Sequence, residues 1–160
     1  MIAERLTAEH WLDLRRMDQD QGFMGMLGGL RDEAGTAVYL EQNLKHWACY
    51  GFGIWILRDE ATATVIGRAI LRHLNVEGVD EIETGYGFMP AYWGQGLATE
   101  IARACVRIGF EQIGLRSIVA ITTPINTASQ RVMMKAGLAY EREITHAGVP
   151  HLLFRTLSRR

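Results

Sequence analysis

The residues with the clearest chemical potential lie where an extended apolar run meets a helical pattern. The run ends at Pro90, and two closely spaced glycines follow within the stretch 93–98, Trp-Gly-Gln-Gly-Leu-Ala. Glycine adopts positive φ without steric cost, and the first N–H groups of a helix lack internal partners at its positive dipole end. Such a turn can hold an anion, and a pyrophosphate fits it. A Gly-x-Gly before a helix is also common as a simple tight turn, so both interpretations are open.

The spacing matches neither of two well-known nucleotide motifs. The Walker pattern needs Lys followed by Ser or Thr after its last glycine, whereas Leu97 and Ala98 follow Gly96 here. The Gly-x-Gly-x-x-Gly fingerprint is also incomplete, because Glu100 and the residues beside it are not glycine. The anion is therefore not expected to belong to either nucleotide class.

Composition limits the class of protein. A chain of 160 residues with 48% apolar residues is expected to form one domain, 1–160. The 17 Lys and Arg residues nearly balance the 18 Asp and Glu residues, so binding to nucleic acid is not expected. No apolar run reaches the roughly 20 residues that a membrane span needs, and the first residues lack a signal pattern, which predicts a soluble, cytoplasmic protein. Cys49 and Cys105 show no metal-ligand spacing, so we expect reduced packing residues and no metal.

The elements that position the glycine turn follow from periodicity. Thr7 is expected to cap a first helix and Thr36 a second, with an apolar, glycine-rich loop from Met24 to Leu30 between them that can border a substrate site. Strands are predicted over 53–58, 64–74, 81–89, 117–122, 139–144 and 151–156. Helices are predicted from near Gly96 and from Asn126 to Gly137. A helix between strands 81–89 and 117–122 predicts that these two run parallel.

Three blocks in this order resemble the GNAT superfamily of N-acetyltransferases, and within it the RimJ/RimL-like branch of ribosomal-protein alanine N-acetyltransferases. They are Glu-Thr-Gly-Tyr-Gly-Phe-Met-Pro (83–90), Tyr-Trp-Gly-Gln-Gly-Leu-Ala-Thr-Glu (92–100) and Asn-Thr-Ala-Ser-Gln-Arg-Val-Met-Met-Lys-Ala-Gly (126–137). The resemblance implies an α+β (mixed α/β) fold: a mostly antiparallel sheet of about seven strands, with a central parallel pair splayed to admit acetyl-CoA and about four flanking helices. It also implies acetyl-CoA as acyl donor, no metal, and a possible homodimer.

The resemblance assigns cofactor binding to a defined set of residues. In the CoA signature, Gly96 and Ala98 match the last two places, while Trp93 stands where Gln or Arg is usual. Because a pyrophosphate cradle uses backbone N–H groups, the exchange at Trp93 does not remove it. The expected cofactor-binding residues are Gly87, Phe88, Met89, Gly94, Gln95, Gly96, Leu97, Ala98, Thr99, Asn126 and Ser129.

The expected reaction assigns catalytic roles to two residues. Attack on a thioester needs a neutral amine, so a base must take a proton, and Glu83 stands where the resembled family often carries its general base. The alternative is a solvated strand residue in an acidic run, with Glu81 on the same face as a second candidate base. Many GNAT enzymes use a tyrosine acid seven residues after the Asn of the third block, but Met133 stands there, so Ser129 is the expected acid. Asn126 holds the pantetheine arm or only caps its helix.

An oxyanion donor completes the expected chemistry. The strand that contains Gly85 and Gly87 can bulge and free the N–H of Gly87 or Phe88, or its glycines can simply admit a close neighbour. His146 and His151 are expected to be surface or packing residues, and Arg131 and Lys135 can face the ribose phosphate of CoA or be solvated. No cysteine lies near the three blocks in a nucleophile setting, which favours direct transfer in a ternary complex.

Three functions are open at this point. The first is acetyl transfer to a primary amine, either a protein N-terminus or a small molecule. The second is a catalytically silent CoA-binding module, consistent with the missing tyrosine. The third is transfer of a longer acyl group, for which the methionine-rich segment 24–30 could make room.

Overall fold

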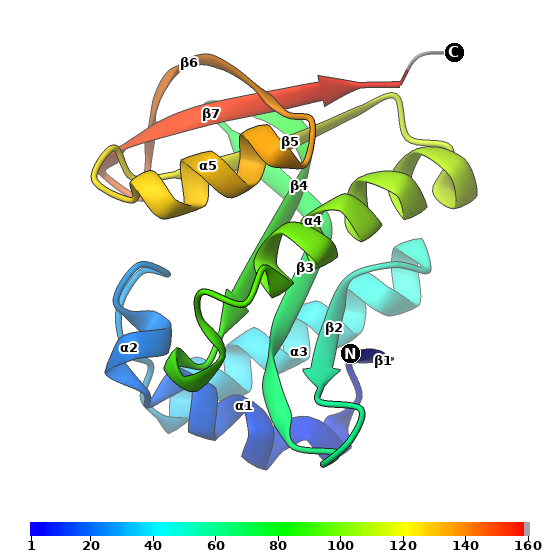
Figure 1. Cartoon of the computed structure of the whole chain (residues 1–160), viewed down its shortest axis with the longest axis vertical. Helices are drawn as coiled ribbons and strands as arrows, with labels where there is room; N and C mark the ends of the chain where they lie inside the picture. The colour runs from blue at the N-terminus through cyan, green and yellow to red at the C-terminus, as the bar shows by residue number, and fades with distance from the viewer. Residues whose placement is uncertain (159–160) are drawn as a thin grey trace. The chain divides into compact units, whose positions relative to one another are not determined.

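Seven strands order as β1-β2-β3-β4-β5-β7-β6 in a computed structural model that describes residues 1–158 (Figure 1). The described chain divides into two compact units, Met1–Ile70 with Tyr86–Gln95, and Leu71–Gly85 with the residues from Gly96 onward. Strands β3 (Val65–Val76) and β4 (Val79–Phe88) contribute to both units. The predicted mixed α/β fold, with a mostly antiparallel sheet and one parallel pair, is confirmed.

The first unit packs helices against the N-terminal strands. Its remaining elements are β1 (Ile2–Arg5), η1 (Ala8–His10), α1 (Trp11–Asp18), α2 (Gln21–Met24), α3 (Glu33–Tyr50), β2 (Ile54–Arg58) and η2 (Pro90–Tyr92). Strand β1 pairs with β2 and β2 pairs with β3, in both cases antiparallel. Alternate strand residues such as Ile54 and Ile56 are fully buried against Leu14 and Met17 of α1, so one face of the strands forms the core.

Two features near the N-terminus differ from the sequence predictions. Strand β1 was not predicted, because four residues with a half-polar pattern carry too little periodic signal. Thr36 is not a cap: α3 begins after Asp32, whose Oδ1 accepts the N–H of Gly35 at 2.7 Å. Thr36 lies one turn inside α3, where it is fully buried and donates to a carboxylate of α1. Thr7 does cap the first helical segment, since its N–H donates to Nδ1 of His10 at 3.0 Å.

A buried ion pair joins α1 to β3 in the first unit. Asp18 is fully buried and accepts from Arg68 of β3 at 2.9 Å, from Arg31 at 2.9 Å and from Thr36 at 3.0 Å. The four residues come from α1, β3, α3 and the loop before α3. A buried carboxylate with this many donors fixes the relative positions of the elements that supply them.

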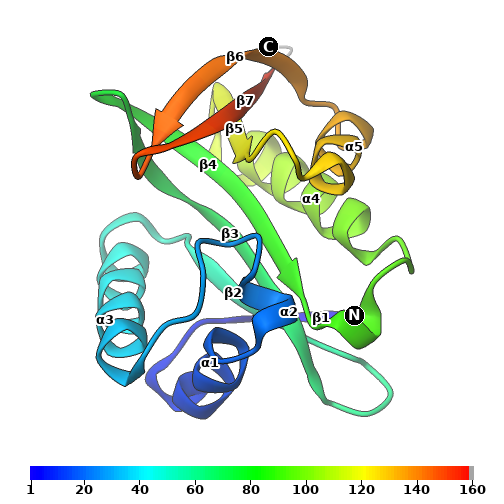
Figure 2. The ribbon, with the colours of Figure 1, turned by 90° about the vertical axis from the view of Figure 1, so that its left-hand side faces the viewer.

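The second unit contains the helices that follow the glycine turn. Its elements are α4 (Leu97–Ile108), the π-helical segment η3 (Gly109–Ile113), β5 (Ser117–Thr122), α5 (Thr127–Lys135), β6 (Ala139–His146) and β7 (Val149–Leu157). Helix α4 buries Ile101, Ala102 and Cys105 on one face, and α5 packs against α4, β5 and β6 (Figure 1). Strands β6 and β7 form an antiparallel hairpin, orange and red in Figure 2.

Strand pairing in this unit confirms the predicted parallel pair. Strand β4 runs parallel to β5 with Glu83 opposite Val119, whereas β5 and β7 pair antiparallel over six residue pairs, from Ser117–Leu157 to Thr122–Leu152. The end of α5 is also as predicted, because Gly137 has a φ of 92°. The parallel pairing places Glu83 of β4 beside Val119 of β5.

Arg155 of β7 connects β7 to β4, β5 and β6 of the second unit. Its guanidinium donates to Glu81 of β4 at 2.9 and 2.7 Å, to Ser117 of β5 at 2.6 Å and to Glu141 of β6. The hydrogen bonds to Glu81 and Glu141 raise the pKa of Arg155 above its usual range. The strands β4, β5, β6 and β7 are therefore held together by the side-chain contacts of Arg155 as well as by backbone pairing.

The cysteines differ from each other. Cys105 is buried in α4 as predicted, and burial raises the pKa of its thiol to about 11. Cys49 of α3 is exposed, so its prediction as a packing residue is wrong. Both thiols are free.

None of the described helices combines the length and apolar character that a membrane crossing requires.

Candidate active site

The glycine turn has the backbone conformation that the sequence predicts. Gly94 has a φ of 75° and Gly96 a φ of 81°, and an added Cβ at either position would meet nothing within 4 Å. The turn is held on its N-terminal side by side chains, because Trp93 Nε1 donates to the carbonyl of Phe88 at 2.7 Å. Gln95 Nε2 also donates to the carbonyl of Ala91 at 3.3 Å. The unusual Trp93 thus fixes the turn to the end of β4.

Five successive N–H groups at this turn have no acceptor among the described residues. They belong to Gly94, Gln95, Gly96, Leu97 and Ala98, whereas the N–H groups of Thr99 and Glu100 bond to the carbonyl of Gly96. Helix α4 begins at Leu97, so these donors lie at its positive dipole end. Unpartnered donors with open space beside them suit an anion, and a pyrophosphate such as that of CoA fits this donor set.

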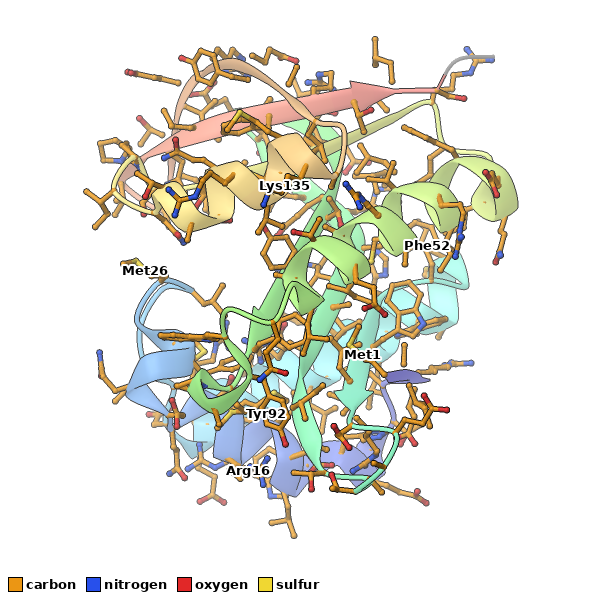
Figure 3. All side chains as sticks on the ribbon, in the orientation of Figure 1. Met1, Arg16, Met26, Phe52, Tyr92 and Lys135 are labelled. Carbon is orange, nitrogen blue, oxygen red and sulfur yellow. The ribbon has the colours of Figure 1, made fainter. Side chains whose placement is uncertain are left out.

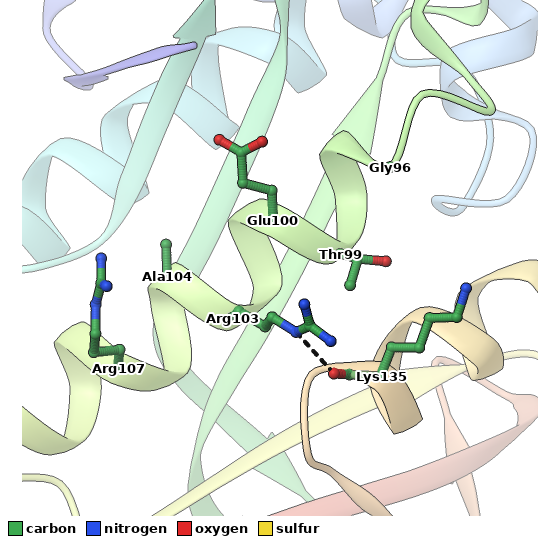
Figure 4. Close-up of a pocket in the computed structure, with 7 residues that line it drawn as sticks. All are labelled: Gly96, Thr99, Glu100, Arg103, Ala104, Arg107 and Lys135. Carbon is green, nitrogen blue, oxygen red and sulfur yellow. Dashed lines mark hydrogen bonds between the residues drawn. The ribbon is translucent and has the colours of Figure 1, made fainter.

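An open depression of about 800 Å³ borders the exposed face of α4 (Figure 4). Its lining includes Gly96 and Thr99 at the start of α4 and Lys135 at the end of α5. Three of the seven lining residues are basic and one is acidic. The lining residues are Gly96, Thr99, Glu100, Arg103, Ala104, Arg107 and Lys135.

The geometry in Figure 4 links the two helices of this depression. Arg103 Nε donates to the backbone carbonyl of Lys135 at 3.0 Å, which ties α4 to the end of α5. Neither Arg103 nor Arg107 is among the site residues expected from the sequence. Their spacing of four residues was the available signal, since it aligns both side chains on the same helix face as Thr99 and Gly96.

The two candidate bases on β4 have different surroundings. Glu83 has a side chain that is 12% exposed and forms one ion pair, with Arg72 Nε 3.8 Å from its Oε2. Glu81 has both carboxylate oxygens bound by Arg155. A carboxylate held at both oxygens is a poor proton acceptor. Of the two, Glu83 keeps the freer carboxylate.

The start of α5 confirms one of the two roles considered for Asn126. Its Oδ1 accepts the N–H of Ser129 at 3.1 Å, so Asn126 caps α5. Ser129 lies in the first turn of this helix and is partly buried. Met133, at the usual tyrosine place, is buried in the unit and offers no proton. Glu83, Asn126 and Ser129 are not among the residues that line the depression.

The residues at the end of β4 pack closely within the first unit. A Cβ on Gly87 would lie 2.8 Å from Phe23 Cζ and 2.9 Å from Leu27 Cδ1. A Cβ on Gly67 of β3 would lie 2.2 Å from the carbonyl oxygen of Gly87. Close packing therefore accounts for both glycines, as one of the two interpretations of Gly87 expected. Phe88 is buried and Met89 is half-buried beside them, and the Met89 N–H donates to Ile66 at 2.8 Å.

The remaining candidates lie outside this arrangement. His146 and His151 form an edge-on ring pair with centroids 5.5 Å apart on the β6–β7 hairpin. Arg131 is exposed on α5. Among residues 1–158, no three His, Cys, Asp or Glu side chains gather in a group that could hold a metal ion.

Similarity to known proteins bears on this site. Residues 1–139 match the acetyltransferase (GNAT) domain family. The uncharacterized protein YkkB of Bacillus subtilis (strain 168) is 33% identical over 125 residues, which cover 78% of this chain and 73% of YkkB. The FsC-acetyl coenzyme A-N(2)-transacetylase of Aspergillus fumigatus is 38% identical over 96 residues, which cover 56% of this chain and 40% of that protein.

A solved structure shares the fold. The acetyltransferase from Agrobacterium tumefaciens str. C58 superposes with a TM-score of 0.85 at 22% identity, over 98% of this chain and 90% of that chain. The match over residues 1–139 includes the glycine turn, the start of α4 and the cap of α5. The chain belongs to the acetyltransferase (GNAT) domain family, whose members are acetyl-CoA-dependent acetyltransferases.

Proposed function

We propose that this protein transfers an acetyl group from acetyl-CoA to a primary amine directly, in a ternary complex. The observation that carries this proposal is the row of five N–H groups without acceptors at the start of α4. These donors would bind the pyrophosphate of CoA. Arg103, Arg107 and Lys135 supply positive charge beside them for the remaining phosphate.

Bound acetyl-CoA supplies the acetyl group as a thioester, which a neutral amine can attack. Glu83 takes the proton of the amine, directly or through water, because it keeps a carboxylate that is not enclosed by donors. Arg72 holds this carboxylate in place from one side. The N–H of Gly87 or Phe88 stabilises the oxyanion, and Met89 contacts the acyl end.

Ser129 donates its hydroxyl proton to the departing thiolate. Its position in the first turn of α5 is set by Asn126, which binds its backbone N–H. Cys105 does not compete as a nucleophile, because burial keeps its thiol protonated with a pKa of about 11. This supports transfer without an acetyl-enzyme.

The proposed branch of the family and the proposed acyl group rest on the sequence motifs and on the names of relatives. The three blocks support membership of the RimJ/RimL-like branch, and the Aspergillus relative is named for acetyl transfer to nitrogen. Acetyl is therefore proposed over a longer acyl group. A cytoplasmic location and a homodimer remain predictions from the sequence.

Release of free CoA from acetyl-CoA with a panel of amines tests the proposal. We expect turnover with at least one primary amine. The product should be heavier than the amine by about 42 Da, the mass that an acetyl group adds when it replaces a hydrogen. Saturable acetyl-CoA binding without transfer to any amine would instead identify a silent CoA-binding module. A faster reaction with longer acyl-CoA donors would point to a larger acyl group.

Gly96→Val tests the cradle. Valine at a φ of 81° is strained by about 1–2 kcal/mol and would displace the N–H donors, so acetyl-CoA affinity should fall about tenfold or more in calorimetry. Gly114→Val is the matched control, since Gly114 has a φ of 80° and equally open surroundings. Equal affinity in the two variants would show that the turn does not bind the cofactor.

A further inference from the structure

The first unit places three arginines around a single buried carboxylate. Asp18 accepts from Arg31 and Arg68 with one oxygen and from Thr36 with the other. Arg15 adds a third guanidinium, because its Nη1 donates to Thr36 Oγ1 at 3.1 Å and to the Arg31 carbonyl at 3.3 Å. One carboxylate balances one guanidinium, so this cluster carries an excess of positive charge.

Other carboxylates nearby in the chain are engaged elsewhere. Asp20 accepts the N–H of Phe23 as the cap of α2, and Asp32 accepts the N–H of Gly35 as the cap of α3. Within residues 1–158, neither forms an ion pair with Arg15, Arg31 or Arg68. Arg68 is 2% exposed, and its buried Nε has no hydrogen-bond partner in the part of the chain that the structure describes. Because Asp18 balances the buried Arg68, the surplus charge lies on the partly exposed Arg15 and Arg31, where an anion can join it.

Arg31 is a partly exposed member of this cluster, as is Arg15. Its side chain is 27% exposed, and it is held by Asp18 through Nη1 and by the Tyr39 ring, whose centroid lies 4.2 Å from its Cζ. Its Nε and Nη2 meet no acceptor in the described chain. These two donors form one edge of the planar guanidinium, which matches the two oxygens of a carboxylate.

The segment that ends at Arg31 also reaches the end of β4. Phe23 and Leu27 pack on Gly87, next to the residues proposed to hold the acyl end. Arg68 lies over the Phe23 ring with its Cζ 5.1 Å from the ring centroid. On the outside of the segment, Met26 is 53% exposed (Figure 3). The short segment 23–31 thus contacts both the arginine cluster and the end of β4.

We infer that Arg31 binds a carboxylate of the acceptor, so that the acceptor is a primary amine that also carries a carboxylate. This inference rests on the proposed acetyl transfer to an amine. Asp18 and Tyr39 orient the guanidinium, and the surplus charge of the cluster favours an anionic acceptor over a neutral one. Arg68 contributes charge from inside the unit.

Binding of reaction products tests this inference without catalysis. The probes are two matched pairs, N-acetyl-L-leucine with N-isopentylacetamide and 4-acetamidobutyrate with N-propylacetamide, which differ only in the carboxylate. We expect calorimetry to show at least one carboxylate probe binding wild type about 10–100 times more tightly than its partner. Arg31→Gln should abolish that preference, and Arg31→Lys should retain part of it.

Arg16→Gln is the matched control, because Arg16 is an exposed arginine of α1 outside the cluster. It should keep the full preference for the carboxylate probe. Equal binding of both members of each pair by wild type overturns the inference, as does a preference that survives Arg31→Gln. If Arg31→Gln fails to fold by circular dichroism, the Arg31→Lys variant decides by the same comparison.

Kinetics with the parent amines separates this inference from the proposed function. L-leucine and 4-aminobutyrate should be acetylated with higher kcat/KM than isopentylamine and propylamine. Turnover of all four at equal kcat/KM supports the transferase and overturns the role of Arg31. Absence of turnover with any amine contradicts the proposed function, while the product-binding comparison still decides the role of Arg31.

Discussion

Glu81 and Glu83 alternate with Ile82 on β4 and so share one face of the strand, yet their surroundings assign them different roles. Arg155 binds both carboxylate oxygens of Glu81, whereas Glu83 forms an ion pair only with Arg72, at 3.8 Å, among the described residues. Strand alternation shows that the two carboxylates share a face, but it does not show which of them is the better proton acceptor. The ranking depends on Arg155, which is 74 residues away from Glu81 in the sequence.

Glu83→Gln should reduce kcat by about 10²–10⁴-fold, because glutamine cannot accept the proton of the amine. The affinity for acetyl-CoA should be unchanged, and the rise of kcat/KM with pH that reports the base should disappear. Steady-state kinetics across pH measures both effects. Glu143→Gln on the exposed strand β6 is the control, and a wild-type rate profile in Glu83→Gln would remove Glu83 from the mechanism.

Cys105 makes the free energy of unfolding depend on pH in the alkaline range. Burial raises its thiol pKa from 9.0 to about 11, so the folded state keeps the proton at pH values where the unfolded state loses it. The free energy of unfolding should therefore fall as pH rises from about 9 toward 11, with no such effect below pH 8. Urea unfolding of wild type and Cys105→Ala at pH 7 and pH 10 isolates this effect. An identical pH dependence in the two proteins would contradict it.

The elements of the first unit depend on one carboxylate. Asp18→Ala leaves the buried guanidinium of Arg68 without a counter-charge, which should reduce the free energy of unfolding by about 3–5 kcal/mol. Asp13→Ala removes a more exposed partner of Arg58, 3.2 Å away, and should cost about 1 kcal/mol or less. Urea denaturation compares the two. Equal losses would show that the buried cluster does not join these elements.

Local patterns predicted most elements, and contacts between distant residues account for the failures. The six predicted strands and the helix after Gly96 were found because alternation and helical periodicity are local. The start of α3 was misplaced at Thr36, since Asp32 is an equally good cap and the partner of Thr36 lies 18 residues away. The site followed the same rule: the glycine turn was predicted, whereas the link between Arg103 and Lys135 was not.

At the scale of the whole molecule, the tryptophans report on only one of the two units. All four, Trp11, Trp47, Trp55 and Trp93, belong to the first unit. The chain is predicted to be one domain, so urea midpoints from tryptophan fluorescence and from far-UV circular dichroism should coincide. A fluorescence midpoint that differs from the dichroism midpoint would show that the first unit unfolds separately.

The polar centre at Arg155 has a consequence for the order of folding. Its contacts join β7 to residues 74, 38 and 14 positions earlier, on β4, β5 and β6. Such contacts close long loops and form late, because loop closure costs entropy before the contact is gained. During synthesis, Glu81 can form its ion pair with Arg155 only after the last strand has been made. The second unit therefore completes its strand arrangement only when β7 is available.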